Sequence, residues 1–256
     1  PSSPLIENYL REAGFWHVTT IGRGCKLDPK LISALIERWR PKTHIFHLPC
    51  GECIITSEDV QLQLRLLVEG SALTESVQSA NWGAICYDLL GMILDNIYGG
   101  RIEIGWLRNI FLKPENSLTE VVRIRYARAY ILEMIGGYLI LDLSRNLIHL
   151  RAMPSNKAKI GGCLSLLQSW ARFHFLFLRP RVNHPYTFSL ITKWTHSVSY
   201  VGIPTALEDI QLLLNQRSEA QFQWTPYEDL AIRVVILDEF FQNPNIWHVK
   251  VSLVNY

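Results

Sequence analysis

Four side chains that bind soft metals follow one another at a spacing of three residues in the stretch HIFHLPCGEC, residues 44–53. They are His44, His47, Cys50 and Cys53. Zinc prefers imidazole and thiolate ligands, and two cysteines separated by two residues also form redox-active pairs. Three interpretations are therefore open: a zinc site, a redox pair, or a piece of core that happens to contain these residues.

The elements around this stretch favour the structural interpretation. IFHL and CIIT flank the turn residues and predict a small β-hairpin near 44–56. Alternate residues of a strand point to opposite faces, and Pro49 prevents one regular helix, so neither geometry brings the four ligands together. Structural zinc sites also combine two ligand pairs across a longer loop, and thioredoxin-type pairs open a helix. We expect no metal and no redox function here.

Local signals predict two helices with defined starts. Asp28 as N-cap and Pro29 at the first helical position open an amphipathic helix over 28–39. A second helix follows the hairpin, where Thr56 caps the start and Asp59, three residues later, completes the cap. The hairpin interpretation therefore also accounts for the start of this second helix, which directly follows the hairpin.

Helical patterns also dominate the rest of the chain. A capping box of Ser117 and Glu120 opens a helix over 117–140, and its apolar positions run nearly all round, as in a central, buried helix. Apolar periodicity predicts two more helices, at 159–178 and 204–216.

The predicted fold class is therefore mainly α. We expect a single globular helical domain over 1–256, with the small β-hairpin near 44–56 and a C-terminal strand near 246–254, where apolar and polar residues alternate.

The composition is that of a globular protein close to neutrality. Hydrophobic residues make up 48% of the chain, charged residues 19%, and the formal net charge is +2. A near-neutral charge does not recommend nucleic acid as a partner. The longest apolar run, 131–143, is shorter than a bilayer span, so no membrane segment is expected. Five cysteines, an odd number, favour a reducing compartment, cytosol or nucleus. Because the chain begins at Pro1, we expect further residues before it.

Known catalytic motifs are absent from the sequence. It contains no phosphate-binding GxxxxGK[ST] loop, no GxSxG elbow and no HExxH helix. Arg179 and Arg181 could grip a partner's phosphates, although salt bridges are the more frequent use of such residues. Trp224 and Tyr227, in EAQFQWTPYED, suit a protein interface, although core packing is their more frequent role. These four are our candidate partner-binding residues, and we predict no catalytic, cofactor-binding or metal-binding residue.

Longer strings carry a resemblance that covers nearly the whole chain. The strings are, in chain order, LISALIERWRPKTHIFHLPCGECIITSEDV, NWGAICYDLLG, IRYARAYILEMIGGYL, IGGCLSLLQSWA and EAQFQWTPYEDLAI. Together they resemble the plant mobile domain, most closely the MAIN-like (maintenance-of-meristems-like) proteins, many of them described as aminotransferase-like or as long-form phosphatase 7 homologues.

The resemblance implies a plant nuclear protein tied to meristem maintenance, genome integrity and silencing of transposable elements, with many copies carried by retroelements. It also implies Phe and Met where Cys50 and Cys53 stand, which a required metal site would not permit. A phosphatase 7-like nuclear protein is the expected partner. The predicted function is therefore a non-enzymatic protein-interaction module that acts in transcription regulation and silencing.

The aminotransferase-like description does not fit the residues. A pyridoxal-phosphate enzyme needs a Schiff-base lysine beside a phosphate cradle, and Lys157 and Lys159 have no glycine- or serine-rich loop next to them. The metal-binding Asp/His motifs of a phosphoprotein phosphatase are absent as well. Three alternatives stay open: a nucleic-acid-binding domain, a cryptic enzyme, and a degenerate transposon-borne copy without function.

This chain departs from the family pattern in three ways. Near 151–156 a longer segment is expected, which is either deleted or left out of this chain, and the domain is expected to be truncated at its C-terminus. Glycine is expected where Arg65 and Glu75 stand. Proline is expected at seven further positions, and every such change is a single C-to-T or G-to-A step, which favours the degenerate copy and predicts marginal stability. The seven are Leu67, Leu94, Leu112, Leu176, Ser189, Leu237 and Ser252.

Overall fold

The computed structural model describes residues 3–21, 26–66, 81–93, 97, 101–111, 114, 118–136, 147–149, 163–216 and 221–241. The chain forms two compact units, which are described separately below. Unit 1 comprises residues 1–23 and 72–164, and unit 2 comprises residues 24–71 and 165–256. A single domain over 1–256 stays a prediction. Among the described helices, none has the length and apolar character needed to cross a membrane.

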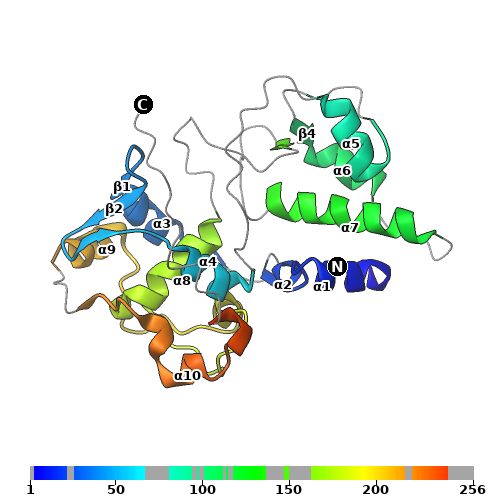
Figure 1. The fold of residues 1–256 in the computed structure, drawn as a ribbon. Coiled ribbons are helices and arrows are strands. Elements are labelled where there is room, and N and C mark those ends of the chain that lie inside the picture. Colours follow the sequence, from blue (N-terminus) through cyan, green and yellow to red (C-terminus); the bar gives the residue numbers. More distant parts are fainter. Residues whose placement is uncertain are drawn as a thin grey trace. The chain divides into compact units, whose positions relative to one another are not determined.

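Unit 1 is mainly helical, with one short two-stranded sheet (Figure 1). Its longest described helix, α7, packs against α1, α5 and α6. One core cluster lies between α5, α6, α7 and strand β4, and its buried members are Cys86, Leu90, Ile102, Ile104, Leu107 and Ala129. In chain order the elements are η1 (Pro4–Ile6), α1 (Glu7–Glu12), α2 (Val18–Ile21), α5 (Trp82–Leu90), β4 (Arg101–Glu103), α6 (Ile104–Ile110), α7 (Glu120–Met134) and β5 (Leu147–His149).

Helix α7 differs from the expectation at its start and in its burial. Its N-cap is Thr119, whose side chain makes no capping hydrogen bond, so the helix begins at Glu120 rather than at the predicted 117. Ser117 of the predicted capping box lies outside the described residues. Its buried residues are Ala127, Ala129 and Met134, whereas predicted core residues such as Ile124 are half-buried. The arginines on its other positions keep α7 from being buried all round.

Those arginines hold the end of helix α5. Arg128 donates from Nη1 to the carbonyls of Asp88 and Leu89, 3.1 and 3.4 Å away. Gly91 ends the helix with φ of +76°, and the Arg125 guanidinium fills the space where a Cβ at position 91 would lie. Only glycine meets both the backbone and the space requirement there.

Unit 2 contains the predicted hairpin within a three-stranded antiparallel sheet of order β1-β2-β3. Helices α3 and α9 pack against each other beside this sheet (Figure 1). The elements are α3 (Pro29–Ile36), β1 (Trp39–Arg40), β2 (Ile45–Leu48), β3 (Gly51–Cys53), α4 (Ser57–Leu64), α8 (Leu164–His174, in this unit from Ser165), η3 (Leu176–Leu178), η4 (Leu190–Thr195), α9 (Leu207–Gln216), η6 (Pro226–Glu228), α10 (Leu230–Arg233) and η7 (Asp238–Phe240).

The core of unit 2 is built around Trp170 of α8, which is fully buried. Its indole stacks on Phe46 of β2 with a centroid distance of 5.3 Å. The other buried members come from α3, the sheet, α8 and α9, and include Leu31, Leu35, Leu48, Cys53, Leu167, Phe175, Ile210 and Leu214. Aromatic side chains bury the largest apolar area per residue, so Trp170 and Phe46 contribute strongly to this core.

The helix predicted at 28–39 is present as α3. Asp28 Oδ1 accepts hydrogen bonds from the N–H groups of Lys30 and Leu31, 3.1 and 3.2 Å away. The helix ends at Ile36, three residues early, because Trp39 pairs with Phe46 in the sheet.

Helix α4 also starts as predicted and ends at an unfavourable residue. Its cap by Thr56 and Asp59 is a complete capping box. Its C-cap is Arg65, whose φ of +53° lies in the left-handed region that favours glycine. Glycine is the residue that the family resemblance implies at this position.

Helix α8 is shorter than the predicted 159–178. The described helix runs over Leu164–His174 and stops where Phe175 pairs with Phe222 in an isolated bridge. Helix α9 begins three residues after the expected start of the 204–216 helix. The predicted strand at 246–254 and the departure near 151–156 lie outside the described residues.

Candidate functional site

The hairpin does not bring the four metal-binding side chains to one point. Phe46 pairs with Cys53, and His47 pairs with Glu52. Phe46 and Cys53 are buried on the core face, whereas His47 and Glu52 are exposed on the other face, with 3.7 Å between Nδ1 and Oε1. Among the described residues, no group of three or more His, Cys, Asp or Glu side chains is arranged to hold a metal ion.

The Cys53 thiol has no features of a reactive cysteine. Burial, the nearby Cys50 charge and a hydrogen bond with Cys50 raise the pKa of Cys53 to about 12. A thiol of this kind is almost entirely protonated near neutral pH, and the thiolate is the nucleophile and metal ligand. Core packing is therefore the role that the environment of Cys53 supports.

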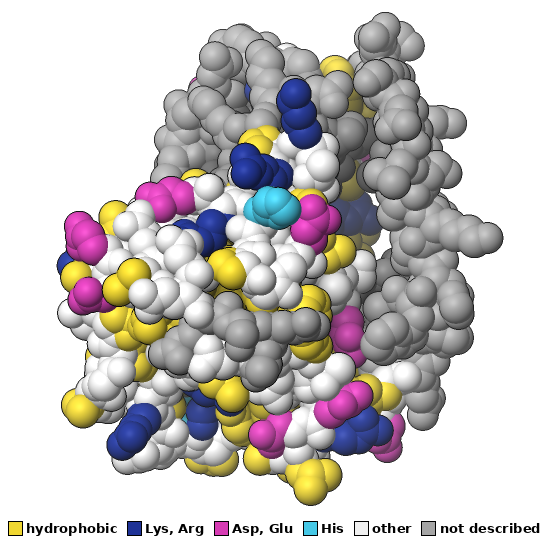
Figure 2. Space-filling view, turned by 90° about the vertical axis from the view of Figure 1, so that its left-hand side faces the viewer, with side chains coloured by type: hydrophobic (Ala, Val, Ile, Leu, Met, Phe, Trp, Pro, Cys, Tyr) yellow, Lys and Arg dark blue, Asp and Glu magenta, His cyan; other side chains and the backbone are white. Residues whose placement is uncertain are grey.

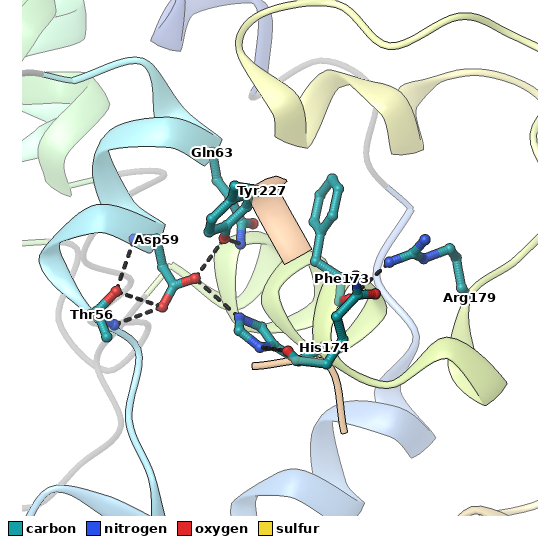
Figure 3. Close-up of polar contacts among 8 residues, drawn as sticks. Thr56, Asp59, Gln63, Phe173, His174, Arg179 and Tyr227 are labelled. Atoms are coloured by element: carbon teal, nitrogen blue, oxygen red, sulfur yellow. Dashed lines mark hydrogen bonds and ion pairs between the residues drawn. The ribbon is translucent and has the colours of Figure 1, made fainter. Parts of the chain in front are cut away.

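A second cluster of polar residues comes together from distant parts of unit 2, centred on Asp59 of α4 (Figure 3). Asp59 Oδ1 accepts from Tyr227 Oη at 2.5 Å and lies 3.1 Å from His174 Nε2. Asp59 Oδ2 accepts from the backbone N–H and the hydroxyl of Thr56, at 2.8 and 2.9 Å. Gln63 donates in turn to Tyr227 Oη at 2.7 Å. We call Thr56, Asp59, Gln63, His174 and Tyr227 the Asp59 network.

The Asp59 network uses both nitrogens of His174. Nδ1 lies 2.7 Å from the carbonyl oxygen of Gln223, which can only accept. Nε2 faces the Asp59 carboxylate, so both contacts are satisfied when the ring carries two protons. Burial alone would raise the pKa of Asp59, but the hydrogen bond and charge of His174, together with Tyr227 and Thr56, hold it below its usual value. His174 and Asp59 therefore form a buried, hydrogen-bonded pair.

Next to this network lies an open cavity of about 380 Å³. One wall is the segment from Glu52 to Asp59, which includes the start of α4, and the other is the segment from Phe222 to Glu228. Trp224 is 50% exposed and packs edge-on against Phe222, with a centroid distance of 4.6 Å. Since Asp59 is bonded to both His174 and Tyr227, the Asp59 network ties the two walls of the cavity together.

The cavity contains carboxylates that the Asp59 network does not use. Glu58 and Glu228 line it, and no ion pair involving either of them occurs among the described residues. Burial raises the pKa of Glu58, and the negative charges of Asp59 and Glu228 raise it further against the opposing charge of His174. The cavity thus has a negative local potential that the described chain leaves only partly compensated.

This arrangement offers little to a catalytic reaction. A general base needs a free lone pair within reach of a substrate, and the contacts of His174 leave neither ring nitrogen open. The Cys53 thiol in the lining is protonated, and the Tyr227 pKa is raised far above its usual value by burial and by Asp59. The cavity is better suited to binding than to bond making.

The structure separates the four candidate partner-binding residues. Trp224 and Tyr227 both line the cavity, Trp224 exposed and Tyr227 buried in the Asp59 network. Arg179 is bound to the end of α8, because its Nε and Nη2 donate to the carbonyls of Arg172 and Phe173 at 2.9 and 2.7 Å (Figure 3). Arg181 is exposed, and its backbone pairs with Ser199. A partner-binding role for these residues stays a prediction.

Sequence reasoning missed the residues that complete this site. His174 and Asp59 are separated by 115 positions and Tyr227 and Asp59 by 168, so no local spacing signals their contact. The signal that was available is weaker: α4 places Asp59, Gln61 and Gln63 at buried positions. Buried polar side chains require partners, and these partners come from elsewhere in the chain.

Charged side chains of both signs are interspersed on the face drawn in Figure 2, among neutral and hydrophobic ones. The described side chains of this face do not gather into an extended basic surface, which is the electrostatic footprint of a nucleic-acid-binding protein.

The comparisons with known proteins agree with the resemblance in the sequence. The model of the family described as plant mobile domain matches residues 14–158 and 151–256. The two matches overlap at 151–158, and the departure from the family pattern expected near 151–156 stays a prediction. No solved structure matches this chain significantly.

Three similar proteins come from Arabidopsis thaliana. "Serine/threonine-protein phosphatase 7 long form homolog" is 29% identical over 99% of this chain and 22% of its own length. "Protein MAIN-LIKE 1" is 28% identical over 96% of this chain and 52% of its own length. "Protein MAINTENANCE OF MERISTEMS" is 31% identical over 72% of this chain and 45% of its own length. The chain therefore spans about half the length of these relatives, or less.

Proposed function

Because this chain belongs to the plant mobile domain family, we propose that it is a protein-interaction module rather than an enzyme and that it works in the plant nucleus. The observation that carries the proposal is the cavity beside the Asp59 network. Its groups with catalytic potential are engaged in internal contacts, whereas the aromatic surface of Trp224 is half exposed.

The surroundings of the cavity also suit a protein partner. Leu230 and Val234, one helical turn apart at α10, are 83% and 80% exposed. Arg233, from the same segment, lines the cavity. Exposed apolar side chains next to an aromatic anchor are typical of protein interfaces. A phosphatase 7-like protein is the proposed partner and meristem maintenance is a proposed process, since relatives carry these words in their names. Silencing of transposable elements is proposed from the family resemblance alone.

Direct binding between the purified chain and a purified phosphatase 7-like protein tests the proposal. Trp224→Ala should weaken binding by about 30-fold, as expected when an interface anchor is truncated. Leu212→Ala is the matched control, because Leu212 is similarly exposed at 52% but lies on α9. It should leave the affinity unchanged.

The contrary outcome is equally clear. If neither this protein nor any partner purified from plant nuclei binds, and the chain instead binds DNA or RNA tightly with a steep salt dependence, the chain is a nucleic-acid-binding domain. Recovery of the chain from the nuclear fraction of plant cells checks the proposed nuclear location.

A further inference from the structure

The cavity beside the Asp59 network combines an exposed aromatic surface with negative charge. Trp224 offers an indole that is half exposed and is fixed against the buried Phe222. Indole faces attract cations through the ring quadrupole, and they also pack against the aliphatic stem of a long side chain. An aromatic surface of this kind favours an arginine or lysine side chain over a purely apolar one when acidic groups lie nearby.

Those acidic groups are Glu58 and Glu228, one from each wall of the cavity. Asp59 is different, because its oxygens are already occupied by Thr56, Tyr227 and His174. The raised pKa of Glu58 reflects burial first and then the neighbouring negative charges. A ligand cation would relieve that repulsion and would donate charge-assisted hydrogen bonds to both carboxylates.

The one arginine among the described lining residues does not take this place. The Arg233 guanidinium lies over the ring of Phe241, 4.6 Å from its centroid, and no described ion pair joins it to Glu58 or Glu228. A metal ion is also a poor occupant, because the described residues contain no group of three metal-binding side chains here. A phosphate-bearing ligand would be repelled by the two carboxylates.

We infer that this cavity binds an arginine or lysine side chain from a basic segment of a protein partner, with the cationic group held by Glu58 and Glu228 and its stem packed on Trp224. This inference rests on the proposed protein-interaction function and adds the class of ligand. The open shape and the volume of about 380 Å³ accommodate one long side chain together with part of its backbone.

The probes are three eight-residue peptides of alternating glycine and a second residue, which is arginine, lysine or the neutral arginine analogue citrulline. Binding to the full chain is followed by the NMR signal of the Trp224 indole N–H, which is assigned by its absence in Trp224→Phe. We expect the arginine or the lysine peptide to shift this signal with saturation, and the citrulline peptide to leave it in place. The stronger of the two cationic peptides identifies the preferred head group.

The decisive variant is Glu58→Gln combined with Glu228→Gln, which keeps the side-chain size and removes the two carboxylates proposed to hold the cation. We expect its affinity for the cationic peptides to fall at least about tenfold. Glu208→Gln is the matched control, since Glu208 is exposed on α9 of the same unit, and its affinity should stay within about twofold, the size of a screened, distant charge. Because Glu58 is held in an unfavourable charged state, Glu58→Gln should unfold at no lower temperature than the parent, which separates lost binding from lost folding.

Three results would overturn the inference: no binding of either cationic peptide, equal binding of the citrulline peptide, or equal affinity in the parent and the double variant. The proposed function is tested apart from it. If a protein partner binds the double variant as well as the parent but loses affinity with Trp224→Ala, the chain is an interaction module and the cation site is wrong.

Discussion

Two regions of unit 2 contain histidines and acidic or thiol side chains, and the structure treats them in opposite ways. In the hairpin, His47 and Cys53 are only six positions apart, yet they lie on opposite faces of the sheet. In the Asp59 network, residues as far apart as Asp59 and Tyr227 are in hydrogen-bond contact. In a strand, residues close in sequence can point to opposite faces, whereas in a folded core residues far apart in sequence can be in contact. Short spacing along the chain is therefore weak evidence for a site unless the element geometry supports it.

The largest expected effect comes from removing the centre of the Asp59 network. Asp59→Ala leaves the buried His174 and Tyr227 without the hydrogen-bond acceptor that they share, and we expect the free energy of unfolding to fall by about 2–6 kcal/mol, roughly 1–3 for each unsatisfied group. Glu52→Ala removes the exposed partner of His47 in the hairpin, and we expect a change of less than about 1 kcal/mol. Urea unfolding measures both. If the two variants lose the same free energy of unfolding, the two regions do not differ in their contribution to stability.

The pH dependence of stability gives the next largest effect. The folded-state pKa of Asp59 lies below its usual value, so its contribution is present above about pH 4 and is lost as the pH falls through the folded pKa. The limiting slope that one such group can contribute in this range is about 1.4 kcal/mol per pH unit. Asp59→Asn should flatten the acid limb of a plot of unfolding free energy against pH, whereas Glu52→Gln should leave its shape intact.

A smaller gain is expected at the segment that α4 holds through Gln61. Gln61 donates to the carbonyl of Phe240 at 3.0 Å, and Leu237, three residues earlier, has φ of −70°, which proline adopts. Leu237→Pro should raise the free energy of unfolding by about 0.4–1 kcal/mol, because the unfolded chain loses freedom. Leu178→Pro is the control, since the Leu178 N–H donates to the Phe175 carbonyl at 2.9 Å and its loss should destabilise. A gain at both positions, or at neither, would contradict the argument from family prolines.

The smallest effect is expected in the hairpin, where metal should make no difference. Cys53 is buried and almost fully protonated, so zinc or a chelator should leave the melting temperature unchanged. Elemental analysis of the purified protein is the direct check. Stoichiometric zinc that disappears in Cys53→Ser would show that the hairpin is a metal site after all and would remove the contrast with the Asp59 network.

The sequence predicted those parts of unit 2 that depend on neighbours in the chain. Asp28 and Pro29 start α3, and Thr56 and Asp59 start α4, because capping needs only residues two or three positions apart. The hairpin follows equally from local alternation. Where local signals competed with long-range pairing, the prediction was less accurate: α8 ends at His174 because Phe175 pairs with Phe222, on a distant segment.

For the same reason, the sequence predicted only part of the candidate site. Trp224 and Tyr227 stood out as aromatic residues in a polar stretch, and both line the cavity. Glu58 and Glu228 carry no local mark that distinguishes them from other surface carboxylates, and their approach depends on how α4 and the 222–228 segment are held together. Such convergence is a property of the tertiary structure.

Asp59 serves two structures at once, since one of its oxygens completes the capping box of α4 and the other holds Tyr227 and His174. A fluctuation that pulls the 222–228 segment away would therefore also loosen the first turn of the helix. In an isolated helix the first turn would fray and its amide hydrogens would exchange rapidly with solvent. Here we expect their exchange rate to be limited by the rate at which the cavity wall opens. A partner bound in the cavity would then slow amide hydrogen exchange in the first turn of α4, at residues that the partner need not touch.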